Sequence, residues 1–153
     1  MTEALLLRGD EKVLEVGTGS GYQAAVLSAL AREVVTVERF PSLAEQAAAV
    51  LAELGRANVR VYVAGPTLGW PDEAPYDAII VTAGAPSVPE ALVAQLAPGG
   101  RLVLPVGSRY EQELTRVTLL ADDSLHTERL GPCRFVPLVG EGAWPNDDHP
   151  DLV

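Results

Sequence analysis

The ten residues 13–22 have the sequence VLEVGTGSGY, in which an apolar run containing Glu15 leads into glycines at every second position. The run predicts a buried strand. The glycines predict a turn that brings the backbone close to a ligand, because glycine lacks a Cβ and adopts positive φ readily. The spacing GxGxG differs from the dinucleotide-binding pattern GxGxxG, whose third glycine corresponds to Tyr22 here. The turn therefore predicts a ligand site without identifying the ligand.

Strand and helix patterns alternate around this turn. Strands are predicted at residues 12–16, 34–38, 59–63, 77–82 and 101–106, and the run 34–38 is continuous and β-branched, as is typical of a strand covered on both faces. Patterns of helical period occupy residues 2–7, 22–30, 41–54 and 89–96. This alternation predicts an α/β fold with a Rossmann-like, doubly wound, mostly parallel sheet. Residues 112–120 and 127–138 predict an antiparallel C-terminal hairpin at the sheet edge.

Length and composition fit one domain, since the chain has 153 residues of which 48% are hydrophobic. Residues 1–140 are expected to form this domain, and residues 141–153 an acidic, loose tail. The apolar stretch Ala4–Leu7 is too short for a signal peptide or a membrane span. It therefore predicts a cytoplasmic protein with no membrane partner.

Charge and cysteine content bear on two further classes of partner. The net charge is −10 and Lys12 is the single lysine, which predicts no nucleic-acid partner because phosphate binding needs clustered Lys and Arg. One cysteine, Cys133, cannot form an intramolecular disulfide and leaves too few thiols for a zinc site. No metal is therefore predicted.

Carboxylates next to the glycine turn indicate an adenosine cofactor. In an open parallel sheet, ligands bind beyond the carboxyl ends of the strands where the strand order reverses, and the turn is expected there. Its amides can donate to a carboxylate or phosphate, and Glu15 can accept from an amine. Glu38, at the end of the second strand, can accept both hydroxyls of a ribose. S-adenosylmethionine and a nicotinamide dinucleotide both meet these demands; Tyr22 and the acidic charge favour S-adenosylmethionine.

Longer motifs follow, namely VVTVERFPSLAEQA, GWPDEAPYDAIIVTAGAPSVPEALVAQLAPGGRLVLPVG and RFVPLVG. In order and spacing, the chain from Met1 to about Gly140 resembles the protein-L-isoaspartate O-methyltransferases. The resemblance implies repair of damaged proteins by methylation of isoaspartyl carboxylates in peptides or proteins. It implies cofactor contacts from Glu15, Gly17, Thr18, Gly19, Gly21, Glu38, Arg39, Gly65 and Gln112. It implies substrate-side positions at Ala83, Ala85, Pro86, Arg134 and Phe135.

The chain departs from the family pattern in two places. Where the family typically has Gly-Asp-Gly, this chain has Ala64-Gly65-Pro66, so the aspartate expected to accept from the adenine amino group is absent. One such lost hydrogen bond is expected to cost about 1.5 to 3 kcal/mol, or roughly ten- to over a hundredfold in affinity. The family also carries a segment before the position of Met1, with a Ser/Thr-containing loop that resembles nothing here. No catalytic residue is therefore assigned.

Three functions remain as hypotheses. The first is an isoaspartyl methyltransferase, which needs no general base because a carboxylate is already ionised at pH 7. The second is a non-catalytic domain of the same fold that binds the cofactor or a partner, and the nicotinamide-dependent oxidoreductase ranks third. His126 and His149 are expected to be surface residues. Without the covering segment, exposed apolar surface is expected to favour a homodimer.

Overall fold

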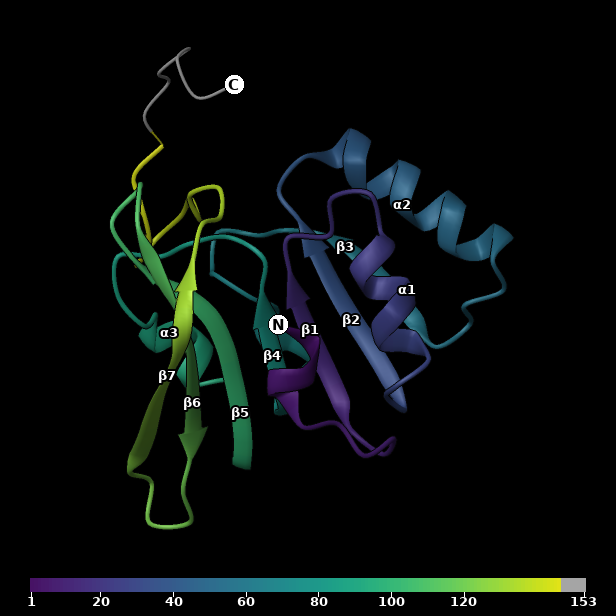
Figure 1. The fold of residues 1–153 in the computed structure, drawn as a ribbon. Coiled ribbons are helices and arrows are strands. Elements are labelled where there is room, and N and C mark those ends of the chain that lie inside the picture. Colours follow the sequence, from purple (N-terminus) through teal and green to yellow (C-terminus); the bar gives the residue numbers. More distant parts are fainter. Residues whose placement is uncertain (147–153) are drawn as a thin grey trace.

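The computed structural model describes residues 1–146, and their strands form one seven-stranded sheet (Figure 1). The strands are β1 (Lys12–Val16), β2 (Glu33–Glu38), β3 (Val59–Val63), β4 (Tyr76–Val81), β5 (Leu96–Gly107), β6 (Gln112–Leu119) and β7 (Leu125–Cys133). Their order in the sheet is β3-β2-β1-β4-β5-β6-β7. Strands β1 to β5 pair in parallel, whereas β6 pairs antiparallel with both β5 and β7. The predicted α/β class, mostly parallel sheet and antiparallel C-terminal hairpin are confirmed.

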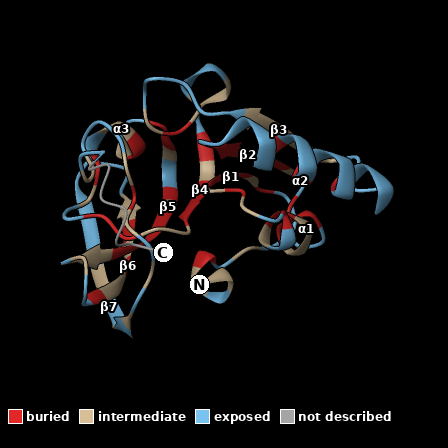
Figure 2. Ribbon diagram, turned by 90° about the horizontal axis from the view of Figure 1, so that it is seen from above, coloured by how far each residue is buried: buried red, intermediate tan, exposed pale blue. Residues whose placement is uncertain are grey.

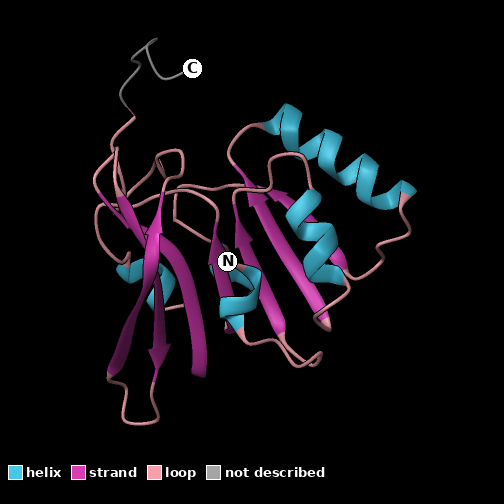
Figure 3. Ribbon diagram, in the orientation of Figure 1, coloured by secondary structure: helices cyan, strands magenta, loops and turns pink. Residues whose placement is uncertain are grey.

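Helices flank the sheet (Figure 3) and cover two separate apolar clusters. They are the 3-10 helices η1 (Thr2–Leu5) and η2 (Pro71–Glu73) and the α-helices α1 (Tyr22–Ser28), α2 (Pro41–Glu53) and α3 (Glu90–Val93). Because side chains alternate along a strand, Val13 packs with Leu5 and Leu27 in one cluster, whereas Leu14 belongs to the other with Leu92. Figure 2 shows that the buried residues concentrate on the strands.

The predicted boundary between residues 89–96 and 101–106 is wrong. Helix α3 ends at Val93, and β5 already begins at Leu96. Tyr76 pairs with Leu96 but Ala78 pairs with Arg101, so β5 contains a bulge of several residues. Judged by its local pattern, Pro98-Gly99-Gly100 indicates a loop between two elements. Glycine also allows the backbone to bend within a strand, as it does in β5.

The predicted last strand is also wrong in its second half. Strand β7 ends at Cys133, and the chain then crosses to the carboxyl end of β4. There Gly84 N donates to Val136 O at 2.7 Å, and Leu138 N donates to Gly84 O at 2.8 Å. These bonds replace pairing along β6, so residues 136–138 lie beside Gly84 in the loop after β4 and not at the sheet edge.

Of the expected tail, residues 141–146 lie within the described part of the chain. They form a turn that packs back on the chain, in which Trp144 N donates to Leu138 O at 2.9 Å. The rest of the predicted tail, residues 147–153, lies outside the described residues.

Candidate functional site

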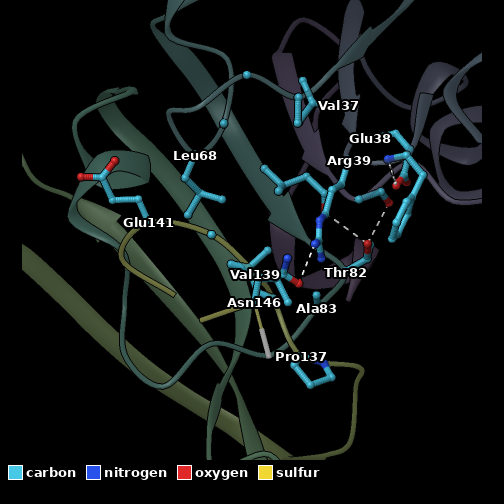
Figure 4. A pocket seen from close by; sticks show the side chains of 18 of the residues that line it. Val37, Glu38, Arg39, Leu68, Thr82, Ala83, Pro137, Val139, Glu141 and Asn146 are labelled. Carbon is cyan, nitrogen blue, oxygen red and sulfur yellow. Dashed lines mark hydrogen bonds between the residues drawn. The ribbon is translucent and has the colours of Figure 1, made fainter. Parts of the chain in front are cut away.

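A cavity of about 570 Å³ lies beyond the carboxyl ends of β1, β2 and β4 (Figure 4). The chain passes from β1 through β2 to β3 on one side and continues from β4 on the other, so the cavity lies where the strand order reverses. Loops that follow four strands line it, together with the C-terminal segment: Gly17, Gly19, Glu38–Phe40, Ala64–Gly69, Thr82, Ala83, Val136–Glu141 and Asn146.

The glycine turn is held against the end of β2. Gly17 N and Thr18 N donate to Val37 O at 2.9 and 3.2 Å. Gly17 has a φ of 99°, and a Cβ there would lie 2.5 Å from Thr82 Oγ1, which itself donates to Gly17 O at 2.9 Å. Gly19 has a φ of 53° and open space around a Cβ, on the cavity wall. The turn therefore needs glycine at position 17 for close packing and presents bare backbone to the cavity at position 19.

We expect Gly17→Ala to destabilise the fold by about 1–3 kcal/mol, because alanine resists this φ and its methyl group overlaps the Thr82 hydroxyl. Urea unfolding measures the free energy of unfolding. Gly65→Ala is the matched control, since Gly65 has no positive φ and open space around a Cβ, and we expect a change within about 0.5 kcal/mol. Equal stabilities of the two variants would show that the turn tolerates a side chain at position 17.

Glu38 presents an oriented carboxylate to the cavity. Its Oε2 accepts from Gly19 N at 2.8 Å, and its Oε1 accepts from Phe40 N at 3.1 Å. The residue is only 6% exposed, so its side chain has little freedom to turn away. Each carboxylate oxygen retains a lone pair, and two adjacent acceptors suit the two hydroxyls of a ribose.

Glu15 lies beneath the turn and is not part of the cavity wall, although the sequence predicted a cofactor contact for it. Its side chain is fully buried, and Thr36 Oγ1 donates to its Oε1 at 2.6 Å. Thr18 Oγ1 lies 2.6 Å from Thr36 Oγ1, and since the Thr36 hydrogen goes to Glu15, Thr18 is the donor. Glu15 Oε2 has no hydrogen-bond partner among residues 1–146. Burial raises the pKa of Glu15 to about 8, with a further contribution from the charge of Glu38 against the opposing Thr36 hydrogen bond.

Two other predicted cofactor residues also support the site from outside the cavity. Gly21 begins α1 with a φ of 87°, and a Cβ there would lie 3.4 Å from Ala47 Cβ on α2. Gln112 is 4% exposed; its Oε1 accepts from Phe135 N at 2.7 Å and its Nε2 donates to Ser108 O at 2.8 Å. Both amide atoms of Gln112 therefore hold protein segments together.

The predicted substrate-side residues lie on two segments that meet at the cavity. Ala83 lines the cavity, Ala85 is buried beside β5, and Pro86 is exposed. Arg134 is exposed and Phe135 half-buried on the segment that crosses from β7 to β4. The pairing of Gly84 with residues 136–138 joins these two segments at the cavity.

Several lining residues were missed. Thr82 directly follows the buried strand β4, which ends where the strand order reverses. Its position in the sequence could therefore have identified it as a lining residue. Arg39, which the sequence did predict, donates from Nη2 to Asn146 Oδ1 at 2.8 Å, and these residues are 107 positions apart. No local pattern connects them. Asn146 and the apolar side chains Phe40, Leu68, Leu138 and Val139 therefore became visible only in the structure.

Residues 1–146 show neither a metal-ligand cluster nor a membrane-spanning helix. In that part of the chain, no three His, Cys, Asp or Glu side chains are grouped closely enough to hold a metal ion. None of its helices is long and apolar enough to cross a membrane. His126 lies on the exposed edge strand β7, and His149 lies outside the described residues.

Known proteins resemble the chain over nearly its whole length. Residues 1–143 match the sequence model of the family Protein-L-isoaspartate(D-aspartate) O-methyltransferase. The protein-L-isoaspartate O-methyltransferase of Geobacter metallireducens is 55% identical over 148 residues, which cover 97% of this chain and 68% of that protein. The protein of the same name from Trichlorobacter lovleyi is 56% identical over 144 residues, which cover 94% of this chain and 66% of that protein. The chain thus spans about two thirds of the length of these relatives.

Solved structures show the same fold. A structure named protein-L-isoaspartate O-methyltransferase superposes with a TM-score of 0.82 at 33% identity, covering 93% of this chain and 46% of that one. A Plasmodium falciparum structure of the same designation, in complex with S-adenosyl-L-homocysteine, superposes with a TM-score of 0.68 at 24% identity, covering 88% and 68%. At that identity, the second likeness concerns the fold alone.

Proposed function

This chain belongs to the protein-L-isoaspartate(D-aspartate) O-methyltransferase family, and on that basis we propose that it is an S-adenosylmethionine-dependent methyltransferase acting on L-isoaspartyl residues of damaged peptides or proteins. The observation that carries this proposal is the Glu38 carboxylate, which lines the cavity at the point where the strand order reverses. The amides of Gly19 and Phe40 orient its two oxygens. This arrangement is suited to a ribose diol.

The residues of the cavity fit S-adenosylmethionine. A volume of about 570 Å³ falls within the usual range of small-molecule sites, roughly 300–1,000 Å³. Glu38 would hold the ribose, the backbone of Gly17 and Gly19 would adjoin the methionine part, and Val37, Phe40 and Leu68 offer apolar surface to the base. When bound, the cofactor supplies an electrophilic methyl group on a sulfonium cation.

The protein's own contribution is alignment and exclusion of water. The substrate carboxylate is already ionised at pH 7, so no side chain has to remove a proton. Holding the reacting groups in line can lower the barrier by up to about 7–11 kcal/mol. Ala83, Val136 and Pro137 line the cavity where the β4 loop meets the crossing segment, and we assign the substrate carboxylate to this side. Arg134 and Phe135 flank that side on the crossing segment.

Transfer of a radiolabelled methyl group tests the activity. We expect base-labile labelling of an isoaspartyl peptide, well above a no-enzyme control, and none of the same peptide with a normal aspartyl residue. Calorimetry with S-adenosylmethionine and with NAD tests the cofactor. Binding of S-adenosylmethionine without transfer would favour the non-catalytic domain, and tighter binding of NAD would reject the proposed cofactor.

Gly65→Asp is expected to tighten binding of S-adenosylhomocysteine by up to roughly tenfold, because a carboxylate at this wall can accept from the adenine amino group. The substitution is sterically open, since no atom lies within 4 Å of a Cβ at Gly65. Calorimetry measures the dissociation constant. The inosine analogue lacks the amino group and is the matched control, so its affinity should not rise. An equal gain for both ligands would contradict a specific contact with the amino group.

We also propose a cytoplasmic location and a homodimer. The single cysteine, Cys133, supports a compartment where structural disulfides are not needed. Exposed aromatic and apolar side chains after β1 and β2 and on the crossing segment support self-association: Tyr22 is 76%, Phe40 52% and Val136 70% exposed. Sedimentation velocity distinguishes monomer from dimer.

A further inference from the structure

Residues 138–146 form what we call the C-terminal strap, which runs along the mouth of the cavity. Leu138, Val139, Gly140, Glu141 and Asn146 all contribute to its lining. Figure 4 shows the labelled side chains of Val139 and Asn146 opposite the loop that carries Glu38 and Arg39. The strap therefore faces the side of the cavity to which the ribose is assigned.

One end of the strap is firmly anchored. Leu138 is 7% exposed, and its amide donates to Gly84 O at 2.8 Å. The strap then turns back on itself: Trp144 N donates to Leu138 O at 2.9 Å, and Gly140 N donates to Trp144 O at 3.1 Å. The Arg109 guanidinium, from the loop between β5 and β6, lies 4.9 Å from the centroid of the Trp144 ring. These contacts fix the strap to the β4 and β5 side of the cavity.

The other end is held across the cavity mouth by a side-chain hydrogen bond. Asn146 Oδ1 accepts from Arg39 Nη2 at 2.8 Å, as the dashed line in Figure 4 shows. Arg39 directly follows Glu38, and its guanidinium also lies 5.2 Å from the centroid of the Phe40 ring. Arg39, Phe40 and Asn146 are exposed. We call this hydrogen bond the latch, because it joins the strap to the β2 side.

The closed strap is poised to open. The latch connects two exposed side chains, so water can replace it at little loss. The strap also buries Trp144 Nε1 without a hydrogen-bond partner among residues 1–146. Opening would return this donor to water and recover hydration that the closed form lacks. Both features lower the cost of opening the strap, and a ligand that contacts the closed form can shift the balance toward closure.

We propose that the C-terminal strap is a gate, which opens to admit S-adenosylmethionine and closes on it through the Arg39–Asn146 latch. Asn146 and Trp144 are then positioning residues, because they act on the cofactor through the strap and through Arg39. This inference rests on the proposed function, since it takes the cavity to be the cofactor site.

The dissociation rate of S-adenosylhomocysteine tests the gate by stopped-flow fluorescence. Asn146→Ala removes the latch and should speed dissociation roughly three- to tenfold. Asn146→Asp offers Arg39 a charged acceptor, so it should slow both entry and release. Gln46→Ala is the matched control, an exposed amide on α2, and should leave both rates unchanged. Since Asn146 and Gln46 are exposed, all variants should keep the wild-type melting temperature.

Hydrogen exchange of the ligand-free protein gives a second, independent readout. The amides of Gly140 and Trp144 should exchange roughly three- to tenfold faster in Asn146→Ala and more slowly in Asn146→Asp. Unchanged dissociation rates in both variants would overturn the gate while leaving the proposed function intact, whether or not exchange changes. Failure of the wild-type protein to bind S-adenosylhomocysteine would overturn the proposed function, and the gate with it.

Discussion

Glu38→Ala is expected to weaken binding of S-adenosylhomocysteine by roughly 30- to several-hundredfold, which corresponds to about 2–3.5 kcal/mol. The variant loses both acceptors for the ribose hydroxyls. It also releases the amides of Gly19 and Phe40, which the carboxylate holds at 2.8 and 3.1 Å. Isothermal titration calorimetry measures the dissociation constant. The effect is large because a charged acceptor fixed inside the cavity has no replacement nearby on the same loop.

Two further variants separate the ligand contact from its structural support. Glu38→Gln keeps one oxygen acceptor and the side-chain size, so we expect a smaller loss of about tenfold. Glu45→Ala removes an exposed carboxylate from α2 and should bind like the wild type. Wild-type affinity of Glu38→Ala would reject the assignment of the ribose to this residue, and with it the main support for the proposed cofactor.

Glu15→Gln is expected to stabilise the protein increasingly as the pH rises from 5 to 8. Burial raises the pKa of Glu15 from its usual 4.5 to about 8 in the folded protein, so the folded state holds a proton that the unfolded chain releases in this window. Raising the pH therefore favours unfolding, by ~1.4 kcal/mol per pH unit for one proton. Glutamine is neutral at every pH and keeps an acceptor for Thr36, so this contribution disappears.

Urea unfolding at pH 5, 6.5 and 8 measures the effect. The free energy of unfolding of Glu15→Gln should exceed that of the wild type by an amount that grows on the order of 2–4 kcal/mol across this range. Glu45→Gln, on the exposed side of α2, is the matched control and should follow the wild-type profile. Parallel profiles for Glu15→Gln and the wild type would mean that Glu15 is ionised in the folded protein, with hydration or a partner that compensates its burial.

Local patterns in the sequence predicted the elements in the N-terminal half of the chain well. Strands β1 and β3 have the predicted bounds, and α2 begins at Pro41 as expected. These elements were predictable because their signals are local: short runs rich in apolar and β-branched residues for strands, and proline at the first turn of a helix. The glycine turn and Glu38 were predicted as site residues in the same way, since the turn directly follows β1 and Glu38 is the last residue of β2.

The role of Glu15 could not be obtained from its position in the motif. Glu15 lies only two residues before the glycine turn that lines the cavity. Its side chain nevertheless points to the same face as Val13 and is enclosed with Thr36. The alternation of side chains along a strand predicts this shared face, because Val13 and Glu15 are two residues apart. How far burial changes the chemistry of the carboxyl depends on the surrounding elements, and only the tertiary structure supplies them.

The sequence by itself determined the family, the α/β class and the loops that meet at the site, because glycine spacing, apolar runs and long motifs are properties of short segments. Only the tertiary structure decided which residues close the cavity. The path of residues 134–138 depends on their pairing with Gly84, and the latch joins Arg39 to Asn146 across 107 positions. Such contacts arise where the ends of different strands come together, so no periodicity along the chain encodes them.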